Sequence, residues 1–174
     1  MDLVFNSAFS GRYGDDMIKE IFSPTTKFTT WRKLWYILAN SQYKLGVPIP
    51  LHVLTELDKA RMITDVEMRV AADYEEKTHH DVYAHILTLG EVCPTAKPYI
   101  HLGAISCYIT DNTDIIQMRT ALVRLSDMLS DVIHTIVNIA ADYSDQPTIG
   151  YTHYQPAQLT TVGKRFVMWA DALS

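Results

Sequence analysis

The sequence predicts an all-α fold, with an N-terminal helical domain over residues 1–110 and the first helices of a long central helical bundle over residues 111–174. Apolar residues recur at steps of three and four along most of the chain, which is the spacing of helices that pack through one face. Helix-start signals stand before several of these segments. Strand-like alternation is limited to one possible short pairing in the loops.

The N-terminal half is predicted as a series of short and medium helices. Residues 5–14 are expected to form an extended loop around SGRY, followed by a short helix over 15–22. Ser23 and Pro24 are typical of an N-cap and a first helical position, and the apolar pattern after them ends near Gly46. A further short helix is expected over 50–60.

The next two helices flank a histidine pair. Thr64 and Glu67 form a capping-box pattern that opens a helix to about residue 77. The sequence HHD at 79–81 interrupts this helix or starts the next one, which runs to about residue 91 and ends at Cys93 and Pro94. Residues 99–110 are expected to form a polar, glycine-containing loop.

The strongest structural signal is a heptad seam in the C-terminal half. Its apolar positions are Ile115, Met118, Leu122, Leu125, Leu129, Val132, Ile136 and Ile139. A helix of about 30 residues spans roughly 45 Å, so we expect the seam to be buried in a bundle, against other subunits or a further part of the protein. The last helix is expected to start near Pro156 and to continue to Ser174, in the middle of the bundle.

The composition excludes several classes of protein. A chain of 174 residues is long enough for one sizeable core. The net charge of −5 argues against a general nucleic-acid binder but allows an anionic small substrate. The longest apolar run, residues 34–39, is far too short to span a bilayer, and the N-terminus lacks a signal-peptide pattern. We therefore expect a cytoplasmic protein with no nucleic-acid or membrane partner.

The most informative polar segment surrounds His153. This histidine lies among hydroxyl and amide side chains, including Thr152 and Gln155, at the predicted mouth of a helix. Its reference pKa of about 6.5 suits a group that donates a proton near neutral pH. The alternative is a polar loop whose amides only satisfy backbone groups. Three other polar loops lie at predicted helix ends, around Arg12, around His80 and over residues 101–106.

Metal and thiol chemistry have weaker support. Asp81 and His85 are four residues apart and could present two ligands on one helix face, but no third ligand has a recognisable spacing, so no metal site is predicted. The two cysteines, Cys93 and Cys107, suggest neither a disulfide framework nor a zinc site. We expect both to be buried free thiols.

Five segments, in chain order, carry a resemblance to a known family. They are SGRY at 10–13, FTTWRKLW at 28–35, HHDVYAH at 79–85, HLGAISCYITDNTD at 101–114 and THYQPAQLTTVGKR at 152–165. Together they resemble the adenylosuccinate lyases of the fumarase/aspartase superfamily. The resemblance implies an enzyme of purine nucleotide biosynthesis that releases fumarate from adenylosuccinate, giving AMP, and from the succinyl-carboxamide ribotide SAICAR, giving AICAR.

The resemblance also implies roles for residues of this chain. His153 matches the general acid, and His80 is the second catalytic candidate. The substrate-binding positions that it implies are Arg12 and Tyr13 for the phosphate, together with His79, Asp81, His101, Ser106 and Thr152. No cofactor is implied. The complete protein is expected to be a homotetramer whose sites are each built by three subunits, so this chain alone is expected to be inactive, with the base residue outside it.

The sequence departs from the family pattern at two positions, and two alternative functions stay open. His79 stands where the family commonly has arginine, and Ile105 stands where it commonly has threonine, which puts a carboxylate contact in question because isoleucine donates no hydrogen bond. The first alternative function is that of another lyase of the superfamily. The second is a non-catalytic helical assembly module built on the heptad seam.

Overall fold

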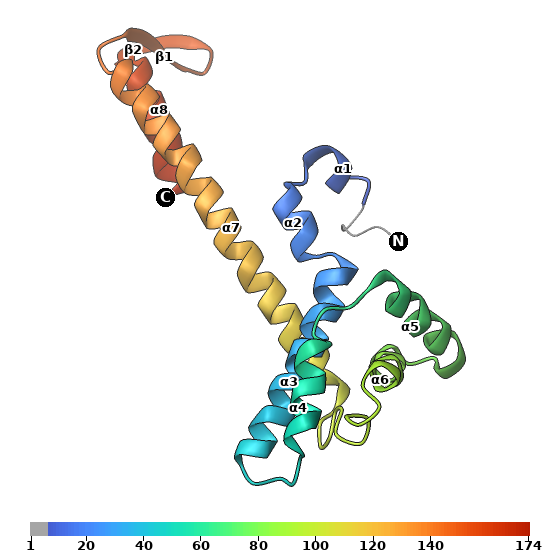
Figure 1. Ribbon diagram of the computed structural model, residues 1–174. Coiled ribbons are helices and arrows are strands. Elements are labelled where there is room, and N and C mark those ends of the chain that lie inside the picture. Colours follow the sequence, from blue (N-terminus) through green and yellow to red (C-terminus); the bar gives the residue numbers. More distant parts are fainter. Residues whose placement is uncertain (1–6) are drawn as a thin grey trace. The chain divides into compact units, whose positions relative to one another are not determined.

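The computed structural model describes residues 7–174 as eight helices and a two-stranded antiparallel sheet, which confirms the predicted helical fold (Figure 1). The chain divides into two compact units, Met1–Ala121 and Leu122–Ser174. The helices of the first unit are α1 (Ser10–Tyr13), α2 (Asp16–Ile21), α3 (Pro24–Lys44), α4 (Leu51–Lys59), α5 (Asp65–Thr78), α6 (Asp81–Val92) and the first turns of α7 (Ser106–Asp142).

Two predicted helix starts of the first unit, at Ser23 and at Thr64, are confirmed. The Ser23 hydroxyl accepts a hydrogen bond from the Thr26 N–H at 3.1 Å, with Pro24 as the first residue of α3. Thr64 and Glu67 form the complete capping box at the start of α5. In contrast, the predicted loop at 10–13 is one helical turn, because the backbone N–H groups of residues 12–14 donate to carbonyls three and four residues earlier.

The core of the first unit is built around α3. Trp31 and Trp35 are almost completely buried and pack with apolar side chains of α4, α6 and the start of α7, which are Val53, Leu54, Leu57, Val82, Leu89 and Ile109. Burial of Ile109 and Thr113 also explains why α7 begins at Ser106, earlier than predicted. Asp111 and Asp114 therefore lie within this helix.

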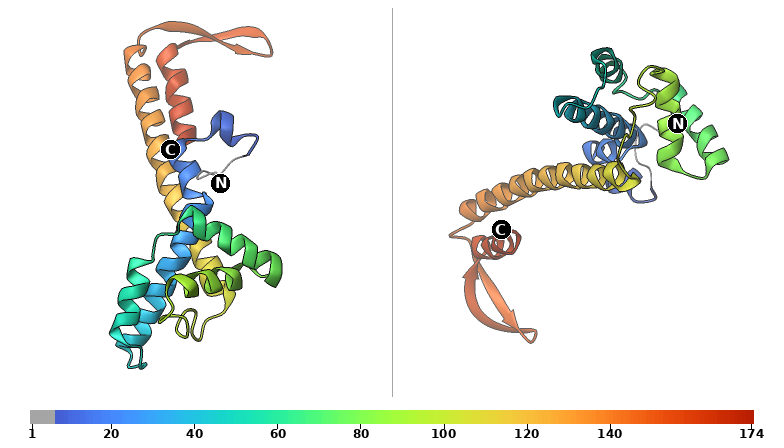
Figure 2. Two further views of the ribbon diagram at one scale, coloured as in Figure 1. Left: turned by 45° about the vertical axis from the view of Figure 1, so that its right-hand side comes forward. Right: turned by 90° about the horizontal axis from the view of Figure 1, so that it is seen from below.

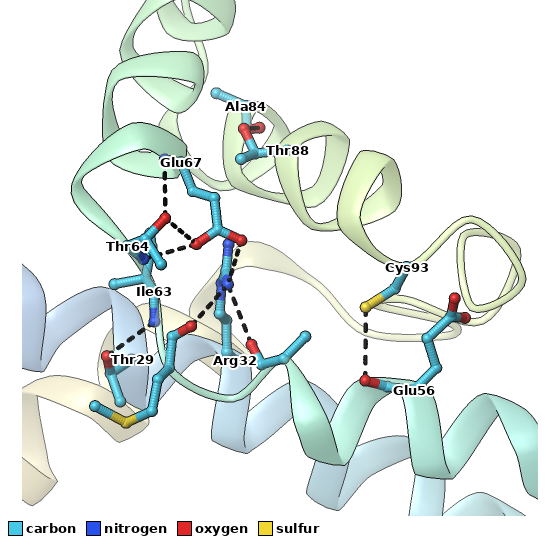
Figure 3. Close-up of polar contacts among 11 residues, drawn as sticks. Thr29, Arg32, Glu56, Ile63, Thr64, Glu67, Ala84, Thr88 and Cys93 are labelled. Carbon is cyan, nitrogen blue, oxygen red and sulfur yellow. Dashed lines mark hydrogen bonds and ion pairs between the residues drawn. The ribbon is translucent and has the colours of Figure 1, made fainter.

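A buried arginine joins α3 to the start of α5 (Figure 3). The Arg32 side chain donates to the carbonyls of Ala60 and Met62, both at 3.1 Å, and pairs with the Glu67 carboxylate at 3.0 Å. Burial alone would raise the pKa of Glu67, but hydrogen bonds from Thr64 and the charge of Arg32 outweigh it and lower that pKa. This network fixes α5, whose C-terminus carries the histidine pair.

His85 and Cys93 are core residues. The His85 ring stacks on Phe28 with 3.9 Å between ring centroids and meets Trp31 edge to face. His85 is therefore part of the hydrophobic core. Burial raises the pKa of the Cys93 thiol to about 11. Cys107 is exposed, so the expectation of two buried thiols is wrong for this residue, which faces outward from the first turn of α7.

The second unit contains the rest of α7, the hairpin of β1 (Pro147–Thr152) and β2 (Gln155–Thr161), and α8 (Val162–Leu173) (Figure 2). The predicted helix start at Pro156 is wrong. Residues 155–161 instead pair with β1, and α8 begins after Thr161, whose hydroxyl accepts from the Lys164 N–H. The β-branched Thr160 and Thr161 favour the extended conformation at this point.

A close contact between helices positions α8 within this unit. A Cβ atom on Gly163 would lie 2.3 Å from the Ala140 carbonyl oxygen, so only glycine fits there. The Gly163 N–H donates to the Tyr143 carbonyl at 2.9 Å. The first turn of α8 is therefore held against the last turns of α7.

The heptad seam lies in one continuous helix, α7, as predicted. Its apolar side chains are largely exposed on the described chain; Ile115 and Leu122 are each 62% exposed. Four large apolar residues of α8, Val167, Met168, Trp169 and Leu173, are exposed as well. Exposed apolar patches of this extent mark surfaces that bind another part of a protein. No helix within residues 7–174 is long and apolar enough to cross a membrane.

Candidate functional site

The turn between α5 and α6 presents the histidine pair. His79 ends α5 in the left-handed conformation, with φ of 53°, and His80 is the N-cap residue of α6. The His80 Nδ1 accepts a hydrogen bond from the Tyr83 N–H at 3.2 Å. The Asp81 carboxylate accepts from the Val82 N–H at 2.7 Å and lies 3.7 Å from the His80 Nδ1. Asp81 thus both stabilises the first turn of α6 and faces His80.

The loop before α7 brings two more predicted site residues to this turn. The Ser106 Oγ lies 3.5 Å from the His80 Nε2. His101 has a φ of 64°, and its Nδ1 accepts a hydrogen bond from the Trp35 indole N–H at 3.0 Å. Burial, and then the nearby His80, lower the pKa of His101. His80, Asp81, His101 and Ser106 therefore form one polar cluster, here called the His80–His101 cluster.

Other predicted residues of the first unit lie outside this cluster. Arg12 and Tyr13 belong to α1 and are exposed, and among residues 7–121 no hydrogen bond or ion pair joins them to the cluster. His79 is exposed on the adjoining turn. The Ile105 side chain is 70% exposed next to Ser106, where it offers no hydrogen-bond donor.

The second unit carries Thr152 and His153 at the tip of the hairpin. Thr152 pairs with Gln155, so His153 and Tyr154 are the two central residues of the turn. Both have positive φ, 48° and 62°, which is the backbone of a type I′ hairpin turn. Such turns normally contain asparagine or glycine, and other side chains are uncommon there. The His153 side chain is exposed at this turn.

The arrangement offers acid–base and anion-binding chemistry. Imidazole, hydroxyl and guanidinium groups lie at helix ends and at a hairpin tip, where their polar atoms are accessible. Among residues 7–174, no group of three or more histidine, cysteine, aspartate or glutamate side chains is placed to hold a metal ion. Asp81 and His85 share a helix, but the His85 ring is packed in the core.

Two features of the site are missed by sequence reasoning. Trp35 lies in the core of the first unit, yet its indole N–H contacts His101, 66 positions away in the chain. The hairpin tip was expected as the mouth of a helix. For the contact between Trp35 and His101, the only sequence signal is that both residues lie in segments that carry the family resemblance. For the hairpin, the signal was the possible short strand pairing in the loops.

The family model described as Lyase matches residues 40–174, and the chain belongs to this family. The adenylosuccinate lyase of Saccharomyces cerevisiae is 41% identical over 170 residues, which cover 97% of this chain and 35% of the yeast protein. Adenylosuccinate lyases of Schizosaccharomyces pombe and Caenorhabditis briggsae are 41% and 38% identical, with the same coverage. The chain thus spans about a third of the length of these relatives.

Solved structures agree on the fold. The fumarate lyase of Mesorhizobium sp. BNC1 superposes with a TM-score of 0.82 at 26% identity, covering 91% of this chain and 37% of that chain. The 3-carboxy-cis,cis-muconate lactonizing enzyme of Pseudomonas putida superposes with a TM-score of 0.85 at 24% identity, covering 97% of this chain and 39% of that chain. The second likeness bears on the fold alone.

Proposed function

We propose that this chain is part of an adenylosuccinate lyase, which releases fumarate from adenylosuccinate, giving AMP, and from SAICAR, giving AICAR. The observation that carries the proposal is the 41% identity to the yeast adenylosuccinate lyase along 97% of the chain. The location of the predicted residues in accessible loops supports it. Because the chain spans only 35% of that relative, the activity is proposed for the complete protein.

The reaction is a β-elimination. A base removes a proton from the carbon next to a carboxylate, the electron pair forms the double bond of fumarate, and the bond between carbon and nitrogen breaks. The leaving nitrogen takes a proton from a general acid. The substrate carries one phosphate and two carboxylates, so it needs several cationic or hydrogen-bonding partners.

We assign the steps to residues of this chain as follows. His153 is the general acid, and Thr152 holds the substrate beside it. Arg12 and Tyr13 bind the phosphate. The remaining substrate contacts come from His79 and the His80–His101 cluster, in which His80 is the second catalytic candidate. The base is supplied from outside this chain, and no cofactor takes part.

The same proposal covers organisation and assembly. Residues 1–110 form the N-terminal domain, and residues 111–174 form the start of the central bundle of a cytoplasmic homotetramer. The 174-residue chain alone is inactive. The exposed apolar faces of α7 and α8 support burial against other parts of the assembly, since Leu122 is 62% and Trp169 is 54% exposed. Sedimentation of the complete protein is expected to give four copies, and a stable monomer would contradict this assembly.

A substrate panel tests the function and separates it from the alternatives. The complete protein is supplied with adenylosuccinate, SAICAR and argininosuccinate, and fumarate is measured. We expect fumarate from the first two substrates and none from the third. Fumarate from argininosuccinate alone would identify another lyase of the superfamily. No fumarate from any of them, with a stable assembly, would favour the non-catalytic assembly module.

A further inference from the structure

We propose that Trp35 and the backbone N–H of Tyr83 hold His101 and His80 in the tautomer that carries its proton on Nε2. In this tautomer each histidine can offer an Nε2–H donor to a ligand. Trp35 is then a positioning residue that acts through His101. The protonation states follow from contacts within this chain, and only their use on a substrate rests on the proposed function.

The contact between Trp35 and His101 determines which nitrogen carries the proton. An indole N–H can only donate, so the His101 Nδ1 that lies 3.0 Å from it must accept. A neutral imidazole has one donor and one acceptor nitrogen, so the proton is on Nε2. The Trp35 side chain is 1% exposed and meets Trp31 edge to face, so it cannot turn its N–H elsewhere. Protonation of Nδ1 would place two N–H donors against each other.

The same argument applies to His80. Its Nδ1 lies 3.2 Å from the Tyr83 N–H, a backbone donor in the first turn of α6. The Nε2 of His80 therefore carries the proton and faces the Ser106 Oγ at 3.5 Å. The groups that face His80 are Asp81 and His101. The Asp81 carboxylate accepts from the Val82 N–H and lies 3.7 Å from the His80 Nδ1, beyond hydrogen-bond distance, so it does not act as a hydrogen-bond acceptor for that nitrogen.

The two Nε2–H groups select a ligand by its chemistry. An Nε2–H group can only donate, so the His80–His101 cluster fits an oxygen that accepts, such as a carboxylate or a carbonyl oxygen. The lowered pKa of His101 agrees with a neutral ring.

The experiment is ¹⁵N NMR of the histidine side chains in the complete protein. We expect His101 and His80 to show an unprotonated Nδ1 and a protonated Nε2 at pH 7. The variant Trp35→Phe keeps an aromatic ring but removes the N–H, and it should lower the ratio of the Nε2–H to the Nδ1–H form of His101 about fivefold, the effect of one neutral hydrogen bond. The pKa of His101 should rise in this variant.

Trp31→Phe is the matched control. Trp31 lies in the same core and is fully buried, but among residues 7–174 its indole nitrogen has no hydrogen-bond partner. The Trp31→Phe substitution should lower the free energy of unfolding by an amount similar to Trp35→Phe and leave the His101 signals unchanged. A protonated Nδ1 on His101 or His80 in the wild-type chain, or equal effects of the two variants, would overturn the proposal. These readouts need no substrate, so they remain valid if the complete protein proves not to release fumarate.

Discussion

Replacing His153 by glutamine in the complete protein is expected to lower kcat for fumarate release by at least about a hundredfold, with substrate binding largely retained. A positioned general acid typically contributes a factor of about 10² to 10⁴, or roughly 3–5 kcal/mol of barrier. Glutamine keeps a hydrogen-bonding side chain but cannot supply a proton at neutral pH. The measurement is the steady-state rate of fumarate release, with binding measured separately.

Two further variants make this test specific. His153 has a φ of 48°, and asparagine adopts this left-handed conformation more readily than most residues, so His153→Asn preserves the hairpin turn while removing the acid. The control is His134→Gln, which changes an exposed histidine on α7. We expect the asparagine variant to be as slow as the glutamine variant and the control to be normal. Near-normal turnover in both His153 variants would exclude His153 as the acid.

Acid is expected to destabilise the first unit through His85. Burial, and then the charges of Arg32 and Lys27, lower the pKa of His85 to about 4, against 6.5 for an exposed histidine, while Asp81 acts in the opposite direction. The unfolded chain therefore binds a proton between pH 6.5 and 4 that the folded chain does not, so stability falls as the pH falls through this window. The two pKa values differ by about 2.5 pH units, which corresponds to at most about 3 kcal/mol.

Urea unfolding of the 174-residue chain, followed by tryptophan fluorescence at several pH values, measures this effect. His85→Leu removes the titrating group from the core and should abolish most of the loss between pH 6.5 and 4. His52→Leu changes an exposed histidine on α4 and should leave the loss intact. If the wild-type chain and His85→Leu lost the same stability in this window, His85 would not be the cause.

Local signals in the sequence predict most of the fold. The caps at Ser23 and Thr64 and the seam along α7 depend on residues three or four positions apart, and all three are confirmed. The start of α7 was predicted too late because burial of Ile109 against α3 extends the helix toward its N-terminus. The strand at 155–161 was missed because its hydrogen-bond partners lie in β1, and helix propensity does not include them.

The candidate site is predicted less completely for the same physical reason. The resemblance picks out His80, His101 and Ser106 by their motifs, but the contact between Ser106 and His80 joins residues 26 positions apart. The bond from Trp35 to His101 spans 66 positions. Contacts of this kind depend on how α3, α6 and α7 pack, so a sequence pattern can name the residues without assigning their protonation states.

The most direct test of the proposed function identifies both products of the complete protein acting on adenylosuccinate. Elimination breaks the bond between nitrogen and the succinyl carbon, so we predict that AMP and fumarate form in equal amounts. NMR spectra recorded while the substrate disappears measure both products. Hydrolysis at the purine carbon would instead give IMP and aspartate. Either those products or unchanged adenylosuccinate would contradict the proposal that this chain belongs to a fumarate-releasing adenylosuccinate lyase.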